Sequence, residues 1–227
     1  MKFDIITIFP QIFNSYFNES ILKRAQKKKK IKIKIHDLRK FTTDKHKTID
    51  DKPYGGGVGM IMKVEPVYKA LQSLKKTKKQ SFDKAQDRKN KKTKTILFTP
   101  TGKTFNQSIA RRLSKYDSIT MICPRYEGHD ARIEKLVDEK ISIGDYVLTG
   151  GEIPAMIVTD AITRLLPGVL GKDSSSQEES FSKPNYLEYS QYTRPEEFQG
   201  MKVPKILLSG NHAKIQEWKN KNSKIKK

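Results

Sequence analysis

The chain has 227 residues, with 46 Lys and Arg against 25 Asp and Glu, a formal net charge of +21 and a single cysteine, Cys123. This length allows one large or two modest domains with a real core, and one cysteine excludes an intramolecular disulfide and suits a reducing cytoplasm. The basic excess favours a polyanionic partner, most often nucleic acid, over a merely soluble basic protein. A membrane protein and a secreted protein are not expected, since no apolar run approaches a membrane span and the N-terminus lacks a signal peptide.

Hydrophobic patterning predicts strands that alternate with helices along most of the chain. The predicted strands cover 3–9, 31–37, 95–99, 118–123 and 140–144, and the predicted helices cover 65–76, 105–116, 132–139 and 155–166. Such alternation is typical of an α/β domain built on a largely parallel sheet. Near the C-terminus the pattern predicts a short strand at 205–209 and a helix at 212–221.

Two segments interrupt this order. Residues 75–94 hold ten Lys or Arg and two Asp, which predicts a solvated low-complexity insert that attracts phosphates without reading sequence. Residues 167–184 are rich in Gly, Ser and Pro and predict a linker that is longer than an ordinary connection. The expected organisation is a domain at 1–166, the linker at 167–184 and a small, mainly helical domain at 185–227 that buries little core alone.

Four glycines stand among residues 55–59, in the stretch DDKPYGGGVGM at 50–60. A phosphate-binding P-loop is excluded because Met60 and Ile61, not Lys and Ser or Thr, follow Gly59. The dinucleotide fingerprint also fails, since its third glycine is missing. Two interpretations remain, a mobile surface loop or a backbone that lets a ligand approach closely.

Three unusual segments follow predicted strands, at 99–102, 124–128 and 143–154. In an open parallel sheet, ligands bind beyond the carboxyl ends of the strands, so these segments are expected to meet there. They supply glycines, the apolar side chains of Tyr146 and Leu148, and free backbone polar groups, but none of the lysines that a triphosphate needs. The combination suits a small ligand with an adenine ring and little negative charge.

Seven motifs occur in order over nearly the whole chain, apart from the insert: DKHKTIDDKPYGGGVGM, RYEGHDAR, SIGDYVLTGGEIPA, PGVLG, ESF, YTRP and LLSGNHAKI. In these motifs the chain resembles the bacterial tRNA (guanine-N1)-methyltransferase family of the SPOUT class. The resemblance implies a C-terminal trefoil knot in the sheet, S-adenosylmethionine as cofactor, and a homodimer whose active sites use both subunits. It also implies transfer of a methyl group to N1 of guanine 37 of tRNA, with the glycine-rich stretch near the target nucleotide.

The resemblance further implies roles for individual residues. Catalysis is expected from Glu179 as general base and Arg164 as partner of the guanine oxygen. The expected cofactor-binding residues are Leu97, Phe98, Thr99, Pro100, Pro124, Tyr126, Glu127, Gly128, Ser142, Ile143, Gly144, Tyr146, Leu148, Gly150, Gly151 and Pro154. The expected substrate-binding residues are Asp50, Tyr54, Gly55, Gly56, Gly57, Gly59, Ser209, Asn211 and His212. Gly150 and Gly151 are expected to be small because side chains there would collide with the cofactor.

The chain departs from the family pattern at two of these positions. Glu179 stands where the family has Asp, which keeps the carboxylate and lengthens its reach by about one bond. Pro124 stands where the family usually has Gly, which removes a backbone amide donor. The chain also stops soon after Trp218, whereas family members usually continue, so the grip on tRNA is expected to be reduced or transferred to the lysine-rich segments.

Two other functions stay open at this level. Cys123 suggests a pyrimidine C5-methyltransferase with a cysteine nucleophile, although no base is visibly paired with it and a buried thiol is the simpler interpretation. The basic charge and the two departures also fit an RNA-binding relative without catalysis. The family resemblance implies a use of Mg²⁺, but the four scattered histidines and the carboxylates form no cluster that locates a metal site.

Overall fold

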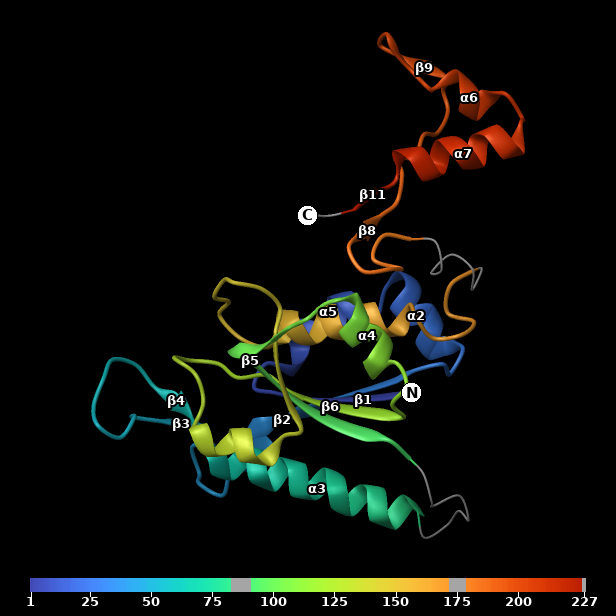
Figure 1. The fold of residues 1–227 in the computed structure, drawn as a ribbon. Coiled ribbons are helices and arrows are strands. Elements are labelled where there is room, and N and C mark those ends of the chain that lie inside the picture. Colours follow the sequence, from blue (N-terminus) through green and yellow to red (C-terminus); the bar gives the residue numbers. More distant parts are fainter. Residues whose placement is uncertain (83–90, 172–178, 226–227) are drawn as a thin grey trace. The chain divides into compact units, whose positions relative to one another are not determined.

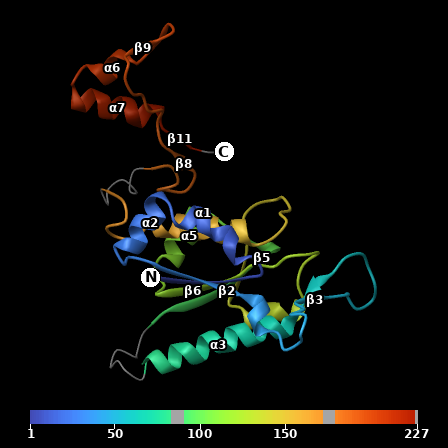
Figure 2. The same ribbon diagram turned by 180° about the vertical axis from the view of Figure 1, so that it is seen from behind.

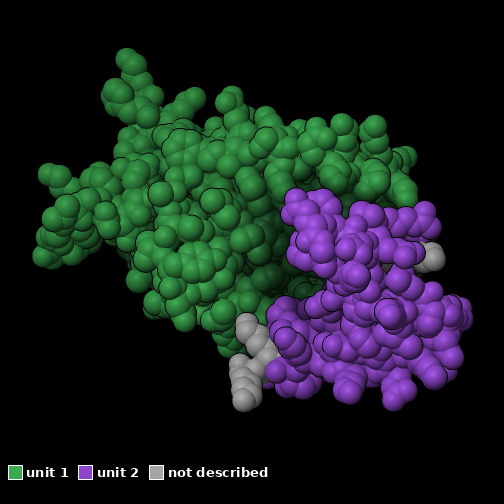
Figure 3. All heavy atoms as spheres, turned by 90° about the horizontal axis from the view of Figure 1, so that it is seen from above, with its two compact units in different colours: residues 1–170 green, residues 171–227 purple. Residues whose placement is uncertain are grey.

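The computed structural model describes residues 1–82, 91–171 and 179–225. The chain forms two compact units, residues 1–170 and 171–227 (Figure 3). Of the 18 positions in the linker predicted at 167–184, eleven are described, and residues 172–178 lie outside the described residues. The boundaries at 166 and 184 therefore stay predictions.

Unit 1 contains a five-stranded sheet in the order β2-β1-β6-β5-β7, in which all neighbours are parallel. The strands are β1 (Lys2–Thr7), β2 (Lys32–Asp37), β5 (Thr93–Thr104), β6 (Ser118–Ile122) and β7 (Glu139–Ser142). The central strands β1 and β6 are buried almost throughout, as expected for strands covered on both faces. The α/β prediction is confirmed, while the trefoil knot stays a prediction of the resemblance.

Helices cover both faces of the sheet (Figures 1 and 2). One face carries α1 (Asn14–Phe17), α2 (Ser20–Lys27), α4 (Gln107–Leu113) and α5 (Glu152–Thr163). The other face carries α3 (Val64–Phe82), with the 3₁₀ helices η2 (Leu38–Phe41) and η3 (Ala131–Leu136) packed against it. Alternate strand residues enter two cores because successive side chains point to opposite faces: Phe3 and Ile5 join one core, and Ile6 joins the other.

Several predicted elements differ from the structure. The insert predicted as a loop at 75–94 is helical in α3 up to Phe82 and extended in β5 from Thr93, while 83–90 lie outside the described residues. The helix predicted at 132–139 is the 3₁₀ helix η3, because Glu139 already begins β7. The strand predicted at 205–209 is wrong: α6 (Lys205–Leu208) forms there, since a helical turn follows Pro204.

The segment between β1 and β2 holds elements that the patterning did not predict. These are η1 (Pro10–Phe13), α1 and α2. Pro10 stands at the start of η1, where a missing amide hydrogen costs nothing. Phe13, Phe17 and Leu22 enter the core beneath α5, so these short helices are held by tertiary packing rather than by length.

Unit 2 is small and contains α6, α7 (His212–Asn222), and two-stranded ladders of β8 (Tyr186–Leu187) with β11 (Lys224–Ile225) and of β9 (Glu197–Phe198) with β10 (Met201–Lys202). The edges of Trp218 and Tyr189 meet at a ring-centroid distance of 6.2 Å, and Tyr192 lies 6.4 Å from the same indole. No side chain is fully buried among the described residues of this unit. Little hydrophobic burial therefore stabilises it.

Asp4 is a buried carboxylate in β1 whose titration links stability to pH. Its side chain is 0% exposed, and its oxygens lie 2.8 Å from His36 Nε2 and 2.7 Å from Lys2 Nζ. Burial raises the pKa of Asp4, but hydrogen bonds and charges of His36 and Lys2 outweigh it, so the pKa lies below 3.8. A depressed pKa stabilises the fold above the unfolded-state pKa of about 3.9, and this stability is lost as the pH falls through the folded-state value.

We therefore expect Asp4→Asn to reduce the free energy of unfolding by about 2 kcal/mol at pH 7, because a charged hydrogen-bonded group is lost. The difference from the unchanged protein should shrink as the pH falls below the unfolded-state pKa and through the lowered pKa of folded Asp4. Denaturant unfolding at a series of pH values measures both effects. The control is Asp51→Asn, which removes an exposed carboxylate and should change stability little; a pH-independent loss at Asp4 would contradict the linkage.

Candidate functional site

A cavity of about 360 Å³ lies at the carboxyl edge of the sheet in unit 1. Its volume is in the range of small-molecule sites. The three segments expected to meet at this edge do so, and the cavity is lined by Phe98, Thr99, Pro100, Thr101, Pro124, Arg125, Tyr126, Glu127, Gly128, His129, Ala131, Glu134, Ile141, Ser142, Ile143, Gly144, Tyr146, Val147, Leu148, Thr149, Gly150, Gly151 and Pro154. Of the expected cofactor-binding residues, only Leu97 does not line the cavity. Its side chain is fully buried in the core between the sheet and α3.

The first wall of the cavity comes from within a strand. Residues 99–102, predicted as a loop, belong to β5, but Phe98 and Lys103 both pair with Ile141, so the residues between them bulge out of the sheet. Gly102 makes this possible: a Cβ atom there would lie 2.5 Å from the backbone nitrogen of Ile141. The bulge moves Thr99 and Pro100 into the cavity wall, as bulges beside functional sites commonly do.

A buried ion pair joins the other two walls. Arg125 Nε donates to Glu152 Oε2 at 2.9 Å, and Thr7 Oγ1 donates to Glu152 Oε1 at 2.7 Å. The Glu152 side chain is only 2% exposed and begins α5, where a carboxylate also interacts favourably with the helix dipole. The Arg125 guanidinium lies 4.8 Å from the centre of the Phe9 ring. This network fixes the segment after β6 to the start of α5.

Cys123 and Pro124 immediately precede Arg125 of this network in the chain. Cys123 is fully buried, and burial together with the charge of Glu152 raises the pKa of its thiol well above the usual value. A thiol with a raised pKa is a poor nucleophile, which disfavours the cysteine-dependent methyltransferase. The carbonyl oxygen of Pro124 accepts a hydrogen bond from the Gly151 amide at 2.9 Å, so this backbone contact holds two cavity segments together.

The protein itself requires Gly150 and Gly151 to be small, whether or not the expected collision with a cofactor also applies. A Cβ atom on Gly151 would lie 2.6 Å from the Cα atom of Cys123, and one on Gly150 would lie 2.3 Å from Arg125 Nε. Both collisions are with the protein itself, not with a ligand. A larger side chain at Gly151 is therefore expected to disturb the fold as well as the cavity.

We expect Gly151→Val to lower the free energy of unfolding by about 1–3 kcal/mol or more, because backbone must move to accept the side chain. Ligand affinity of the cavity should fall in the same variant. Chemical denaturation and calorimetric titration measure the two quantities. Gly171→Val is the control, since no atom lies within 4 Å of a Cβ there, and a stable Gly151→Val protein that only loses affinity would restore the original explanation.

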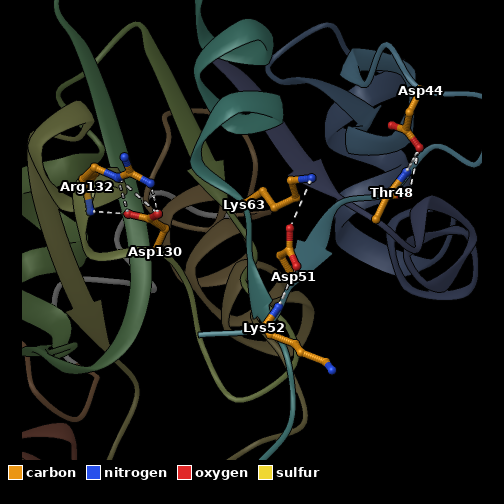
Figure 4. A network of polar contacts seen from close by, with 7 residues as sticks. All are labelled: Asp44, Thr48, Asp51, Lys52, Lys63, Asp130 and Arg132. Atoms are coloured by element: carbon orange, nitrogen blue, oxygen red, sulfur yellow. Dashed lines mark hydrogen bonds and ion pairs between the residues drawn. The ribbon is translucent and has the colours of Figure 1, made fainter. Parts of the chain in front are cut away.

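The glycine-rich stretch forms the tip of a hairpin whose strands are β3 (Asp50–Asp51) and β4 (Ile61–Met62). Gly55, Gly56, Gly57 and Gly59 all have positive φ, a conformation that favours glycine. Tyr54 and Val58 are almost fully exposed at the tip. Figure 4 shows exposed polar contacts beside the hairpin: Asp51 with Lys63 at 3.7 Å, Asp44 with Thr48, and Asp130 with Arg132.

The base of this hairpin is joined to the cavity wall by backbone hydrogen bonds. The Glu127 amide donates to the Met60 carbonyl at 3.1 Å, and the Met62 amide donates to the Gly128 carbonyl at 3.0 Å. The Asp130 amide donates to the Met62 carbonyl at 2.9 Å. Burial raises the pKa of Tyr126, and the charge of Asp50 and a hydrogen bond to its carboxylate raise it further, while Arg39 opposes them. The glycine hairpin is therefore an extension of the cavity wall, not an isolated surface loop.

Sequence reasoning did not name several side chains of the cavity, among them Arg125, His129 and Glu134. Burial lowers the pKa of His129, partly offset by Glu134 at 3.7 Å, while Lys140 Nζ holds Glu134 at 2.7 Å. Their proximity depends on η3 and β7, so the linear sequence carries no signal for it. No group of three or more His, Cys, Asp or Glu that could hold a metal ion occurs among the described residues.

Within unit 1, the other predicted residues do not line this cavity. Arg164 caps the C-terminus of α5, where its amide donates to Asp160. Glu179 belongs to unit 2, where its carbonyl accepts a hydrogen bond from Ser182 and the Ser180 hydroxyl accepts one from Glu188. Asn211 caps α7 by accepting from the Lys214 amide, Ser209 donates to the Ile206 carbonyl, and His212 begins α7.

Comparison with known proteins identifies the family. The model of "tRNA (Guanine-1)-methyltransferase TrmD" matches residues 1–227. The chain belongs to the tRNA (guanine-1)-methyltransferase family. It is 52% identical over 223 residues to a tRNA (guanine-N(1)-)-methyltransferase of Dictyoglomus turgidum, covering 98% of this chain and 85% of the relative. It is 49% identical over 224 residues to the Clostridioides difficile protein of the same name, covering 98% and 92%.

A solved structure supports the same assignment. The crystal structure of the tRNA (m1G37) methyltransferase from Aquifex aeolicus matches with a TM-score of 0.76 and 40% sequence identity, over 96% of this chain and 87% of that one. The resemblance inferred from the seven motifs is thus confirmed, and with it the methyltransferase class of the enzyme. As a member of the tRNA (guanine-1)-methyltransferase family, the chain needs a methyl donor and an RNA surface. None of the described helices has the length and apolar character to cross a membrane.

Proposed function

We propose that this enzyme, a homodimer of the cytoplasm, transfers a methyl group from S-adenosylmethionine to N1 of guanine 37 of tRNA. The observation that carries the proposal is the continuity of the cavity with the glycine hairpin. Backbone hydrogen bonds join residues 60–62 of the hairpin to residues 127–130 of the cavity wall. A methyl donor in the cavity and a nucleotide at the hairpin would therefore be neighbours. The name of the Aquifex aeolicus relative supplies the target position.

The cavity residues fit S-adenosylmethionine. Apolar walls for a flat ring come from Pro100, Ile141, Tyr146, Leu148 and Pro154. Glu127 and Glu134 bring carboxylates to the same cavity, which suits a cationic sulfonium. When bound, S-adenosylmethionine supplies an electrophilic methyl group.

The protein must then prepare the guanine. Neutral guanine carries a hydrogen on N1, so a base has to remove this proton before or as the bond to carbon forms. We assign that role to the Glu179 carboxylate, and we assign to the Arg164 guanidinium the stabilisation of negative charge that develops on the guanine oxygen O6. Both roles rest on position in the family motifs, because Glu179 and Arg164 belong to different units.

The decisive experiment incubates the protein with unmodified tRNA and labelled S-adenosylmethionine and maps the methylated base. We expect label on N1 of guanine 37 and none on tRNA in which adenine replaces that guanine. Calorimetric titration with S-adenosylmethionine accompanies the assay. Tight tRNA binding without cofactor binding or methyl transfer would instead identify an RNA-binding relative that lacks catalysis.

Mg²⁺ is implied by the family, and the same assay with and without EDTA tests the requirement. The described residues do not fit a metal site of three or more protein ligands, so we derive no step through the ion. Loss of methyl transfer on chelation, restored by Mg²⁺, would then point to an ion held mainly by cofactor and RNA.

An apolar surface on unit 1 supports the homodimer. Phe9, Ile12 and Tyr16 from the η1–α1 segment and Ile153 and Ile157 from α5 are each 39–51% exposed, and η1 contacts α5. Grouped apolar side chains of this size mark interaction surfaces. Sedimentation should show a dimer that Ile153→Asp/Ile157→Asp converts to an inactive monomer. Ile225→Asp, which changes an exposed isoleucine of unit 2, is the control, and a fully active monomer would refute the dimer.

A further inference from the structure

A strongly basic segment of unit 1 lies outside the lining of the cavity. Seven cations occur within residues 24–34, in the sequence RAQKKKKIKIK. All seven side chains are exposed, and no ion pair is found for any of them among the described residues. This basic strip consists of Arg24, Lys27, Lys28, Lys29, Lys30, Lys32 and Lys34.

The fold holds the basic strip on two neighbouring elements. Arg24 and Lys27 belong to the last turn of α2, and Lys32 and Lys34 belong to β2, the edge strand of the sheet. The Lys32 amide donates to the Met1 carbonyl at 2.9 Å, which fixes the start of the strand beside the N-terminus. In Figures 1 and 2 this end of the sheet lies opposite the β3–β4 hairpin.

The strip leads from that end toward the site. Lys32 and Lys34 alternate with half-buried Ile33 and Ile35, so both lysines stand on one face of β2. β2 advances by about 3.3 Å per residue and is followed by η2, which carries Arg39 close to Tyr126 and Asp50 at the cavity wall. Cations therefore stand both at the far end of the sheet and near the hairpin base, with Asp37 between them along the chain.

Protection of the sheet edge explains only part of this charge. Lysines on an edge strand discourage pairing with other chains, and Lys32 and Lys34 alone suffice for that. Lys27–Lys30 precede β2 and therefore do not protect its exposed edge. Cations at a helix C-terminus are favourable near the helix dipole, but this applies within the last turn only.

We propose that the basic strip binds the phosphate backbone of a base-paired tRNA stem while the anticodon loop lies at the hairpin. The proposal rests on the proposed function for the choice of RNA. Unpaired cations along an extended path suit a polyanion with regularly spaced charges, and they position it without reading its bases. Glu19, which lies 3.9 Å from Lys23, is the nearest acidic side chain along the chain before the strip.

The test compares two double variants of the full-length chain. Lys28→Gln/Lys32→Gln removes two charges of the strip. Lys103→Gln/Lys115→Gln removes two exposed lysines outside the strip, one in β5 and one after α4. Each lost phosphate contact lowers the slope of log K against log salt by about 0.7–0.9. We expect the slope for whole tRNA to fall by about 1.4–1.8 in the strip variant and to change little in the control.

Activity assays separate this inference from the proposed function. In the strip variant the KM for whole tRNA should rise on the order of tenfold, while kcat, cofactor affinity and methylation of a short anticodon stem-loop stay unchanged. If tRNA affinity weakens equally in both variants, or stays unchanged while the strip variant self-associates, the role of the basic strip in tRNA binding is refuted. Neither result contradicts the proposed methyl transfer. If the unchanged protein methylates no tRNA but binds it through the strip, the proposed function fails and the strip stands.

Discussion

Replacing Glu179 by Gln is expected to reduce the turnover of methyl transfer by about 10²–10⁴-fold, the range in which a general base contributes. The amide keeps the size and hydrogen bonding of the side chain but cannot take the N1 proton of guanine. Affinity for S-adenosylmethionine should barely change, because the role assigned to Glu179 is to take a proton from guanine and not to hold the cofactor. Single-turnover rates and calorimetric titration measure the two quantities.

Two further variants sharpen this prediction. Glu179→Asp restores the family residue and should retain activity, unless the turn at 179–188 has adjusted to the longer side chain. Glu178→Gln is the matched control one position away, although Glu178 itself lies outside the described residues. Inactivation by Glu178→Gln but not by Glu179→Gln would shift the assignment by one residue, and full activity in both would mean that the proton leaves by another route.

Replacing Glu152 by Gln should have the largest effect on stability. Glu152 is almost fully buried between Thr7 and Arg125, and its loss leaves the Arg125 guanidinium next to a neutral amide. Breaking a buried ion pair typically costs 3–5 kcal/mol; we expect about 3 kcal/mol, because the Arg125 side chain keeps 20% of its surface in water. Cofactor affinity should fall as well, since the pair joins two walls of the cavity.

The pair can also be removed as a whole. In Arg125→Leu/Glu152→Leu no charge remains buried, so part of the lost stability should return, while the cofactor affinity should not. Denaturant midpoints measure the first effect and titration the second. Glu65→Gln, which breaks an exposed pair with Lys69 on α3, is the control and should change neither quantity much. An unchanged midpoint for Glu152→Gln would show that the network does not support the cavity.

The linear sequence determined the fold class, the family and the three segments that line the cavity. Buried runs such as 118–122 and the alternation of 32–35 mark strands by local pattern, and motifs such as SIGDYVLTGGE are specific enough to identify relatives. The cluster of glycines at 55–59 also marked an unusual backbone in the sequence, and all four adopt a positive φ that few other residues tolerate.

Only the tertiary structure decided which groups these segments contact. Arg125 and Glu152 are 27 positions apart and Thr7 is 145 positions from Glu152, so no local pattern reveals their network. The same holds for Gly151, whose size is set by the backbone of Cys123, and for the bulge of β5, which depends on pairing with β7. Local patterns in the sequence predict strands, helices and turns. Contacts between residues that are far apart in the chain form only when the whole chain folds, so the sequence pattern does not reveal them.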